Sequence, residues 1–172
     1  GVHVYIPKVV VTGPYNAGKS TFVHTVSDTA VSVDRLGTTV ALDHGHVTIN
    51  GVTADIFGTP GQARFDPILR TVAGQALGVI VLVDATKPDT FPRARELLEK
   101  TVVHGIPVII AANKQDLPGA LTPEEVEARL KPPRHVKVIG CSGQDRASSR
   151  RLLETMNDNI VLRGMAPQEA SA

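Results

Sequence analysis

The stretch from Gly13 to Ser20 reads G-P-Y-N-A-G-K-S and directly follows the apolar run from Lys8 to Thr12. A short β-branched run of this kind predicts a buried strand, and the residues after the stretch predict a helix. Glycines near both ends let the backbone bend so that successive N–H groups point at one anion, and the positive end of the helix adds to that field. The pattern in this setting predicts a phosphate-binding loop.

Two side chains of this loop have defined chemistry. Lys19 is long enough to reach the outer phosphates as a point charge, and the hydroxyl of Ser20 is placed to bind Mg²⁺. We therefore expect Mg²⁺ as the cofactor. The residues predicted to contact phosphate in this loop are Gly13, Tyr15, Asn16, Ala17, Gly18, Lys19, Ser20 and Thr21.

Size and charge limit the class of protein. The 172 residues predict a single domain over 1–163, and residues 164–172 are expected to form a flexible tail. A net charge of +1 gives no basic excess for nucleic acid, and no apolar stretch approaches the length of a membrane span. With Cys141 as the only cysteine and no lipid-anchor motif at either end, a cytoplasmic location without a membrane anchor is expected.

Apolar, β-branched runs alternate with helical segments, which predicts a mostly parallel sheet covered on both faces. Asn50-Gly51 is a strong signal for a two-residue turn, so the strands on either side should be antiparallel neighbours. Strands are expected at Val4 to Val11, Thr39 to Ile49, Val52 to Phe57, Leu77 to Asp84, Ile106 to Ala112 and Val136 to Ile139. Helices are expected at Lys19 to Val26, Thr90 to Val103, from Pro123 to the Pro132-Pro133 pair, and Arg146 to Val161.

A second motif, N-K-Q-D from Asn113 to Asp116, follows a predicted buried strand. The two carboxylate oxygens of Asp116 suit the N1–H and amino group of guanine, a donor pair that adenine does not present. Asn113 can bond the purine edge and neighbouring loops, and the stem of Lys114 can lie along the base. After the last strand, the turn Cys141, Ser142 and Gly143 offers backbone N–H groups to the guanine oxygen.

These motifs, in this order and spacing, resemble the Ras superfamily of small GTPases from Lys8 to about Val161. The segment F-G-T-P-G-Q, Phe57 to Gln62, is more similar to prokaryotic members, related to gliding-polarity and conservon GTPases. The resemblance implies an α/β P-loop NTPase fold, a three-layer sandwich with a six-stranded, mostly parallel sheet, one antiparallel strand and about five helices. It also implies GTP and GDP as ligands and regulatory or effector proteins as partners, among them a Roadblock-type protein.

The same resemblance implies a switch driven by GTP hydrolysis. Thr38 or Thr39 would cover Mg²⁺ and the γ-phosphate, with Thr39 slightly favoured, and Gly61 would donate its N–H to that phosphate. Gln62 would orient the attacking water, alongside Lys19.

Gly58 departs from the family, which has an aspartate there that holds Mg²⁺ through a water. Without that carboxylate, Mg²⁺ should be retained less firmly. Asp55 and Asp84 are the two substitutes considered, although alternation along the strand places Asp55 on the face opposite Gly58.

Tyr15 stands where many relatives have glycine, in the path of an arginine from an activating partner. This directs attention to an arginine of the chain itself. Arg35 precedes the threonines by a distance similar to that of the catalytic arginine in Gα subunits. The simpler interpretation of Arg35 is a solvated loop arginine. Arg64 is a weaker candidate for the catalytic arginine. His44 and His46 are interpreted as an exposed polar face, because no third ligand is spaced to join them in a zinc site.

Two functions are consistent with these residues. The first is a guanine-nucleotide switch that hydrolyses GTP slowly and depends on an activator. The alternative is a pseudo-GTPase, an interaction module that holds nucleotide with little or no turnover. Gly58 and Tyr15 favour the alternative, whereas Gln62 and the threonines favour the first.

Overall fold

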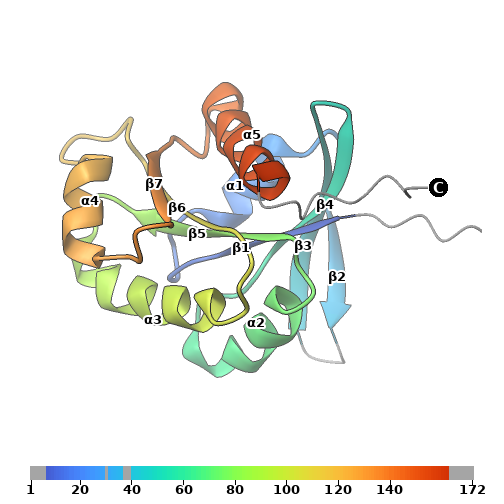
Figure 1. Ribbon diagram of the computed structural model, residues 1–172, viewed down its shortest axis with the longest axis horizontal. Coiled ribbons are helices and arrows are strands. Elements are labelled where there is room, and N and C mark those ends of the chain that lie inside the picture. Colours follow the sequence, from blue (N-terminus) through green and yellow to red (C-terminus); the bar gives the residue numbers. More distant parts are fainter. Residues whose placement is uncertain (1–6, 30, 37–39, 163–172) are drawn as a thin grey trace, which may run out of the picture.

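The computed structural model describes residues 7–29, 31–36 and 40–162, with the backbone alone at 34–36, 40, 161 and 162. The described chain forms a sheet between two layers of helices (Figure 1). The strands are β1 (Lys8–Thr12), β2 (Ser32–Leu36), β3 (Val40–Ile49), β4 (Val52–Gly58), β5 (Gly78–Asp84), β6 (Val108–Asn113) and β7 (Lys137–Gly140). The helices are α1 (Lys19–Val26), α2 (Asp66–Ala73), α3 (Phe91–Val102), α4 (Pro123–Leu130) and α5 (Arg146–Leu162), with short 3₁₀ turns η1 (Ala63–Phe65) and η2 (Pro88–Thr90).

The seven strands lie in the order β2-β3-β4-β1-β5-β6-β7. Strand β3 runs antiparallel to both of its neighbours, whereas β4, β1, β5, β6 and β7 are mutually parallel. The expected three-layer fold with one antiparallel strand is confirmed. The sheet has one strand more than the six expected, because Ser32–Leu36 pairs along the edge of β3.

The core lies in two layers, one on each face of the sheet. Helices α1 and α5 cover one face, where Phe22, Leu152 and Met156 are buried against β1, β5 and β6. Helices α2 and α3 cover the other, where Leu69 and Leu97 are buried (Figure 1). The central strand β5 is buried along its whole length, as its continuous apolar sequence requires in a sheet covered on both faces.

Local sequence explains several boundaries. Asn50 and Gly51 both have positive φ angles, 50° and 81°, as a type I′ turn between β3 and β4 demands. Thr122 caps α4 in a capping box: its hydroxyl accepts from the Glu125 N–H at 3.1 Å, and the Glu125 carboxylate accepts from the Thr122 N–H at 3.2 Å.

No helix in the described part of the chain is both long and apolar enough to cross a membrane.

Candidate functional site

A cavity of about 990 Å³ opens where the parallel strands end at their carboxyl termini, as expected for an open α/β sheet. The loop after β1, the loop after β4 and the ends of β5 and β6 contribute its walls. A smaller adjoining cavity of about 160 Å³ is lined by Asn113, Asp116 and the loop after β7. The two cavities share Gly18, Thr21, Lys114 and Gln144. The predicted phosphate loop and the predicted guanine motif therefore border one continuous site.

Gly18 sets the transition from the phosphate loop into α1. Its φ angle of 102° lies in the region that favours glycine, and a Cβ there would stand 2.7 Å from Nδ2 of Asn113. A side chain at this position would therefore clash with the residue that joins the two parts of the site. Lys19, the next residue, begins the helix.

Lys19 folds back over the loop. Its Nζ donates hydrogen bonds to the carbonyl oxygens of Gly13 and Pro14, both at 2.8 Å. Partial burial, with a smaller contribution from the positive charge of Arg93, lowers the pKa of Lys19 to about 8. A polyanion in the cavity would stabilise the charged ammonium and reverse this shift.

Asn113 ties together three segments that are distant in the sequence. The side chain is buried, its Nδ2 donates to the Ala17 carbonyl at 2.9 Å, and its Oδ1 accepts from the Gly143 N–H at 2.7 Å. The thiol of Cys141 also donates to Oδ1 at 3.5 Å. Asn113 thus holds the phosphate loop and the loop after β7 in one frame, as the sequence predicted for its contacts to neighbouring loops.

The other members of the guanine motif lie at the rim of the smaller cavity. Lys114 Nζ donates to Asp84 Oδ2 at 2.7 Å and to the Asn16 carbonyl at 3.1 Å, so its stem spans two loops. Asp116 is exposed, and its Oδ1 accepts from the Ser142 hydroxyl at 2.9 Å. Asp116 lines the smaller cavity together with Gly18 and Gly143.

Cys141 contacts Asn113 but lines neither of the two cavities. Burial raises the pKa of its thiol to about 12, so it stays protonated and donates to Asn113. A direct role for Cys141 toward a base remains a prediction.

The loop after β4 lies against the phosphate loop. A Cβ on Gly61 would stand 2.5 Å from the Tyr15 nitrogen and 2.8 Å from the Gly13 oxygen, so the two backbones are in direct contact. Gln62 is exposed and lines the larger cavity. Tyr15 is 64% exposed at the mouth of the same cavity.

Arg93 on α3 anchors this loop, a contact that the sequence analysis missed. Its guanidinium donates to the Gly61 carbonyl at 3.2 and 3.3 Å and to both carboxylate oxygens of Asp66 at 2.6 and 3.1 Å. Lys100 donates to the same carboxylate. The hydrogen bond from Arg93 is the main reason that the pKa of Asp66 lies below its usual value.

Among the described residues, the carboxylate nearest to Gly58 belongs to Asp43, which was not among the substitutes considered from the sequence. Asp43 pairs with Gly58 across the β3–β4 ladder, and its Oδ2 lies 4.0 Å from the position of a Cβ on Gly58. Asp43, Gly58 and Ser20 line the same cavity. The Asn50-Gly51 turn could have predicted this pairing, because Asp43 and Gly58 lie equally far from the turn along the two strands.

The two substitutes considered from the sequence have other partners. Asp55 faces away from Gly58, toward His44 and His46. Asp84 lines the cavity, but hydrogen bonds from Lys114 and Thr86 engage its carboxylate. Burial alone would raise the pKa of Asp84, and these hydrogen bonds outweigh burial and hold it below its usual value.

Several predicted residues are placed only in part. Thr38 and Thr39 lie outside the described residues, as does the predicted tail 164–172. Arg35 lies in β2 opposite Ala41, with its backbone alone described. Arg64 does not line the cavity, and its guanidinium lies 4.7 Å from the centre of the Phe65 ring.

The prediction that no third ligand joins His44 and His46 is wrong. Asp55 on β4 lies opposite His46 in the ladder, and its Oδ1 is 3.2 Å from His44 Nε2 and 2.7 Å from His46 Nδ1. The description as an exposed face also fails for His44, whose side chain is only 16% exposed. Local spacing along one strand could not find a ligand that comes from its neighbour.

The model of the ADP-ribosylation factor family matches residues 6–160. ADP-ribosylation factor-like protein 8b of Arabidopsis thaliana is 34% identical over 116 residues, which cover 65% of this chain and 62% of that protein. ADP-ribosylation factor-like protein 4D of Mus musculus is 31% identical over 129 residues, or 70% and 64% of the two chains. The chain thus matches less than two thirds of the length of these relatives.

Two solved structures share the fold. One is the Arl6 BBS3 small GTPase of Trypanosoma brucei with a bound nucleotide analogue, GppNp, at a TM-score of 0.75 and 18% identity, covering 92% of this chain and 99% of that one. The other is the G domain of the T. maritima FeoB iron transporter, at a TM-score of 0.73 and 23% identity, covering 90% and 98%. The extent of the family match, together with the phosphate loop and the N-K-Q-D motif around one cavity, shows that the chain belongs to the ADP-ribosylation factor family of Ras-superfamily small GTPases.

Proposed function

We propose that the protein binds GTP and GDP and acts as a switch that hydrolyses GTP. The observation that carries this proposal is the position of Asn113, whose one amide group joins the phosphate loop at Ala17 to the loop at Gly143. Asp116 lines the smaller of the two adjoining cavities and Lys19 lines the larger one, which supports a ligand that extends across both. A ligand that satisfies both residues carries a guanine base and a polyphosphate.

Lys19 and the backbone of residues 13–18 would hold the phosphates, and Asp116 would accept from the guanine N1–H and amino group. Lys19 donates to the carbonyl oxygens of Gly13 and Pro14, so its ammonium lies over the phosphate loop. An ammonium has three N–H donors, so Lys19 can also donate to phosphate oxygens, and such charge-assisted hydrogen bonds are stronger than neutral ones.

The residues present also fit Mg²⁺, which prefers oxygen ligands and usually retains several waters. The hydroxyl of Ser20 would bind it directly, together with Thr39 or Thr38, and the carboxylate of Asp43 would take the position that Gly58 leaves without one. When bound, the ion would neutralise charge that develops on the phosphate oxygens. Asp43 lies on the same face as Gly58 and lines the same cavity, so its carboxylate is available there.

For hydrolysis, Gln62 would orient water beside the γ-phosphate and Gly61 would offer its N–H. Arg35 remains the candidate for an arginine supplied by the chain itself. The exposed ring of Tyr15 at the cavity mouth favours the second candidate, a module that holds nucleotide with slow turnover. Measuring conversion of GTP to GDP by chromatography, with Gln62→Leu as the control, separates the two functions.

The segment from Phe57 to Gln62 supports placing the chain with prokaryotic Ras-like members. By that resemblance a Roadblock-type protein would be a partner. The single cysteine, Cys141, supports the cytoplasm as the site of action. Co-purification from cells that express both proteins, with GDP or a non-hydrolysable GTP analogue added, would test this partner.

The base specificity gives a direct test of the proposal. In Asp116→Asn the amide can donate to the C2 carbonyl that xanthine carries in place of the guanine amino group. The variant should lose GDP affinity and gain xanthosine diphosphate affinity, each by at least about tenfold, or about 1.4 kcal/mol. Asp158→Asn, an exposed change on α5, is the matched control and should alter neither. Unchanged GDP binding by Asp116→Asn would overturn the guanine assignment.

A further inference from the structure

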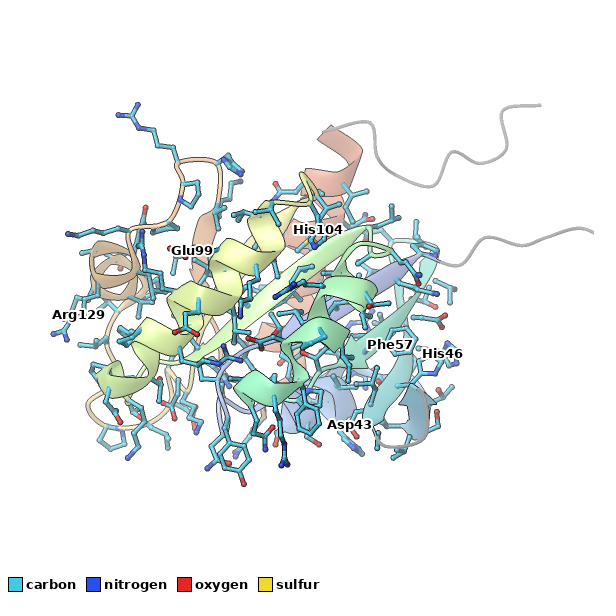
Figure 2. The ribbon with its side chains drawn as sticks, turned by 90° about the horizontal axis from the view of Figure 1, so that it is seen from below. Asp43, His46, Phe57, Glu99, His104 and Arg129 are labelled. Carbon is cyan, nitrogen blue, oxygen red and sulfur yellow. The ribbon has the colours of Figure 1, made fainter. Side chains whose placement is uncertain are left out.

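Strands β3 and β4 bring together a cluster of two histidines and one carboxylate, away from the nucleotide site. His44 and His46 lie two residues apart on β3 and so share one face of the sheet, with Asp55 beside them on β4. The intervening Gly45 faces the other way, toward Ser27 after α1. Figure 2 shows His46 at the outer margin of the sheet, next to Phe57.

The cluster is well ordered by its surroundings. The ring of His44 stacks on Phe57, with 4.3 Å between the ring centres and 13° between the planes. The side chains of His44 and Asp55 are only 16% and 13% exposed, while His46 is 47% exposed and has room to turn. Two of the three groups are therefore fixed before any ligand arrives.

Asp55 has an unusual environment for a carboxylate. Its Oδ1 is buried and accepts no hydrogen bond of good geometry within the described part of the chain, although two imidazole nitrogens lie within 3.2 Å. A buried acceptor without a hydrogen bond is costly, and such atoms in a folded protein call for an explanation. A cation held between this oxygen and the imidazole nitrogens would satisfy it.

The distances agree with that explanation. One nitrogen or oxygen atom from each of His44, His46 and Asp55 lies within 4.8 Å of the other two. Ligands about 2.1 Å from a tetrahedral zinc ion lie about 3.4 Å from each other. The 3.2 Å between His44 Nε2 and Asp55 Oδ1 is close to this value, and a small rotation of the exposed His46 would open its 2.7 Å contact.

We propose that His44, His46 and Asp55 form a binding site for a divalent transition-metal ion such as Zn²⁺, with water in the remaining position. Two imidazole nitrogens and one carboxylate are a ligand set that zinc uses, whereas Mg²⁺ and Ca²⁺ select oxygen ligands. The site is separate from that of nucleotide-bound Mg²⁺, because Asp43 faces the opposite side of the sheet. Bound metal would link β3 to β4 and stabilise their pairing.

The simpler interpretation is a cluster in which a carboxylate lies between two histidines and no metal binds. The two interpretations differ in their response to zinc. We therefore propose titrating the full chain, first stripped with EDTA, with Zn²⁺ in competition with a chromophoric chelator and without added nucleotide. One ion per chain should bind, and the melting temperature should rise with zinc.

The variants make this test specific. His46→Ala and Asp55→Asn should each weaken zinc binding at least tenfold and abolish the thermal shift, while His135→Ala, an exposed histidine elsewhere, should not. His44→Ala is less decisive, because it also removes the stacking on Phe57. GDP binding by His46→Ala and Asp55→Asn, measured in parallel, should match that of the wild type, which shows that the variants fold.

Cobalt provides an independent readout. Co²⁺ bound by these three residues should give visible d–d absorption, and His46→Ala should lose this absorption. The spectrum should show no thiolate charge-transfer band, because Cys141 is buried elsewhere. Zinc affinity that is equal in the wild type, His46→Ala and Asp55→Asn would overturn the proposal. So would the absence of any binding at micromolar zinc.

Discussion

Asp43 lies directly opposite Gly58 in the β3–β4 ladder, with a carboxylate oxygen 4.0 Å from where a Cβ on Gly58 would stand. The two positions face the same cavity as Ser20. A carboxylate can therefore reach this part of the site from either strand. In this chain the carboxylate comes from Asp43 on β3, and the facing position on β4 is Gly58.

The first prediction exchanges the two positions. Asp43→Asn should weaken Mg²⁺ binding to the GDP complex by about 10- to 100-fold, the usual cost of losing an outer-shell partner. Adding Gly58→Asp to that variant should restore much of the loss, since a Cβ at Gly58 meets Val23 and Asp43 only at 3.4 and 3.7 Å. The measurement is the Mg²⁺ dependence of the release of a fluorescent GDP analogue. Equal Mg²⁺ dependence in Asp43→Asn and the wild type would exclude the role of Asp43.

The second prediction concerns pH and Lys19. Because the pKa of Lys19 in the free protein is about 8, a fraction of the chains lacks this charge at pH 8, and polyphosphate binding should restore it. Nucleotide binding should therefore take up protons near pH 8, and affinity should fall as pH rises above that value. Calorimetry in two buffers of different ionisation enthalpy measures the uptake.

Lys19→Arg is the matched control, because a guanidinium stays charged throughout this range. Its binding should show no proton uptake near pH 8. Uptake that persists in Lys19→Arg would assign the proton to another group. The lowered pKa of Lys19 also affects folding stability. Between about pH 8 and 10.5 the unfolded chain binds more protons at Lys19 than the folded chain does. The unfavourable contribution of Lys19 to the folding free energy therefore declines as pH rises through this window.

The third prediction tests the anchoring of the loop after β4. Arg93→Ala removes the guanidinium from the Gly61 carbonyl and from buried Asp66, which still accepts from Lys100. The variant should lose about 1–3 kcal/mol in the free energy of unfolding. Glu96→Ala, which removes an exposed partner of Arg93, should cost at most about 1 kcal/mol. Urea denaturation measures both.

Acid should reduce the difference between Arg93→Ala and the wild type. The pKa of Asp66 is lowered in the folded protein, so its stabilising contribution is present above the unfolded value of about 4 and is lost as pH falls through the folded value. A difference in unfolding free energy that stays constant down to pH 3 would show that Asp66 is not the relevant partner.

The fourth prediction concerns Asn113. Asn113→Ala leaves the Ala17 carbonyl and the Gly143 N–H without their partner and should lower both stability, by about 2 kcal/mol or more, and nucleotide affinity. Asn113→Asp keeps the acceptor for Gly143 and loses the donor to Ala17, so the phosphate loop alone should loosen. Hydrogen exchange of the Ala17 and Gly143 regions distinguishes the two variants. Equal exchange at the Ala17 region in wild type and Asn113→Asp would contradict the proposed link.

The elements with strong local signals were predicted well. Helix α1 spans Lys19–Val26 as expected, and the Asn50-Gly51 turn joins antiparallel strands, because these features depend on nearest neighbours along the chain. Strand β2 was missed, since S-V-D-R-L is short and partly polar and pairs only as an edge strand. Its pairing depends on β3, which no local pattern of Ser32–Leu36 reveals.

The sequence alone predicted the phosphate loop, the N-K-Q-D motif and a mostly parallel sheet whose strand ends bring the two together. Tertiary structure decided which groups each carboxylate meets: Asp43 faces Gly58 and the cavity, whereas Asp55 faces His44 and His46. The physical reason is that alternation along a strand separates the two faces, but only packing decides which face meets the cavity. Contacts between residues far apart along the chain, such as Arg93 with Gly61 and Asn113 with Ala17, arise only when the helices and loops close over the sheet.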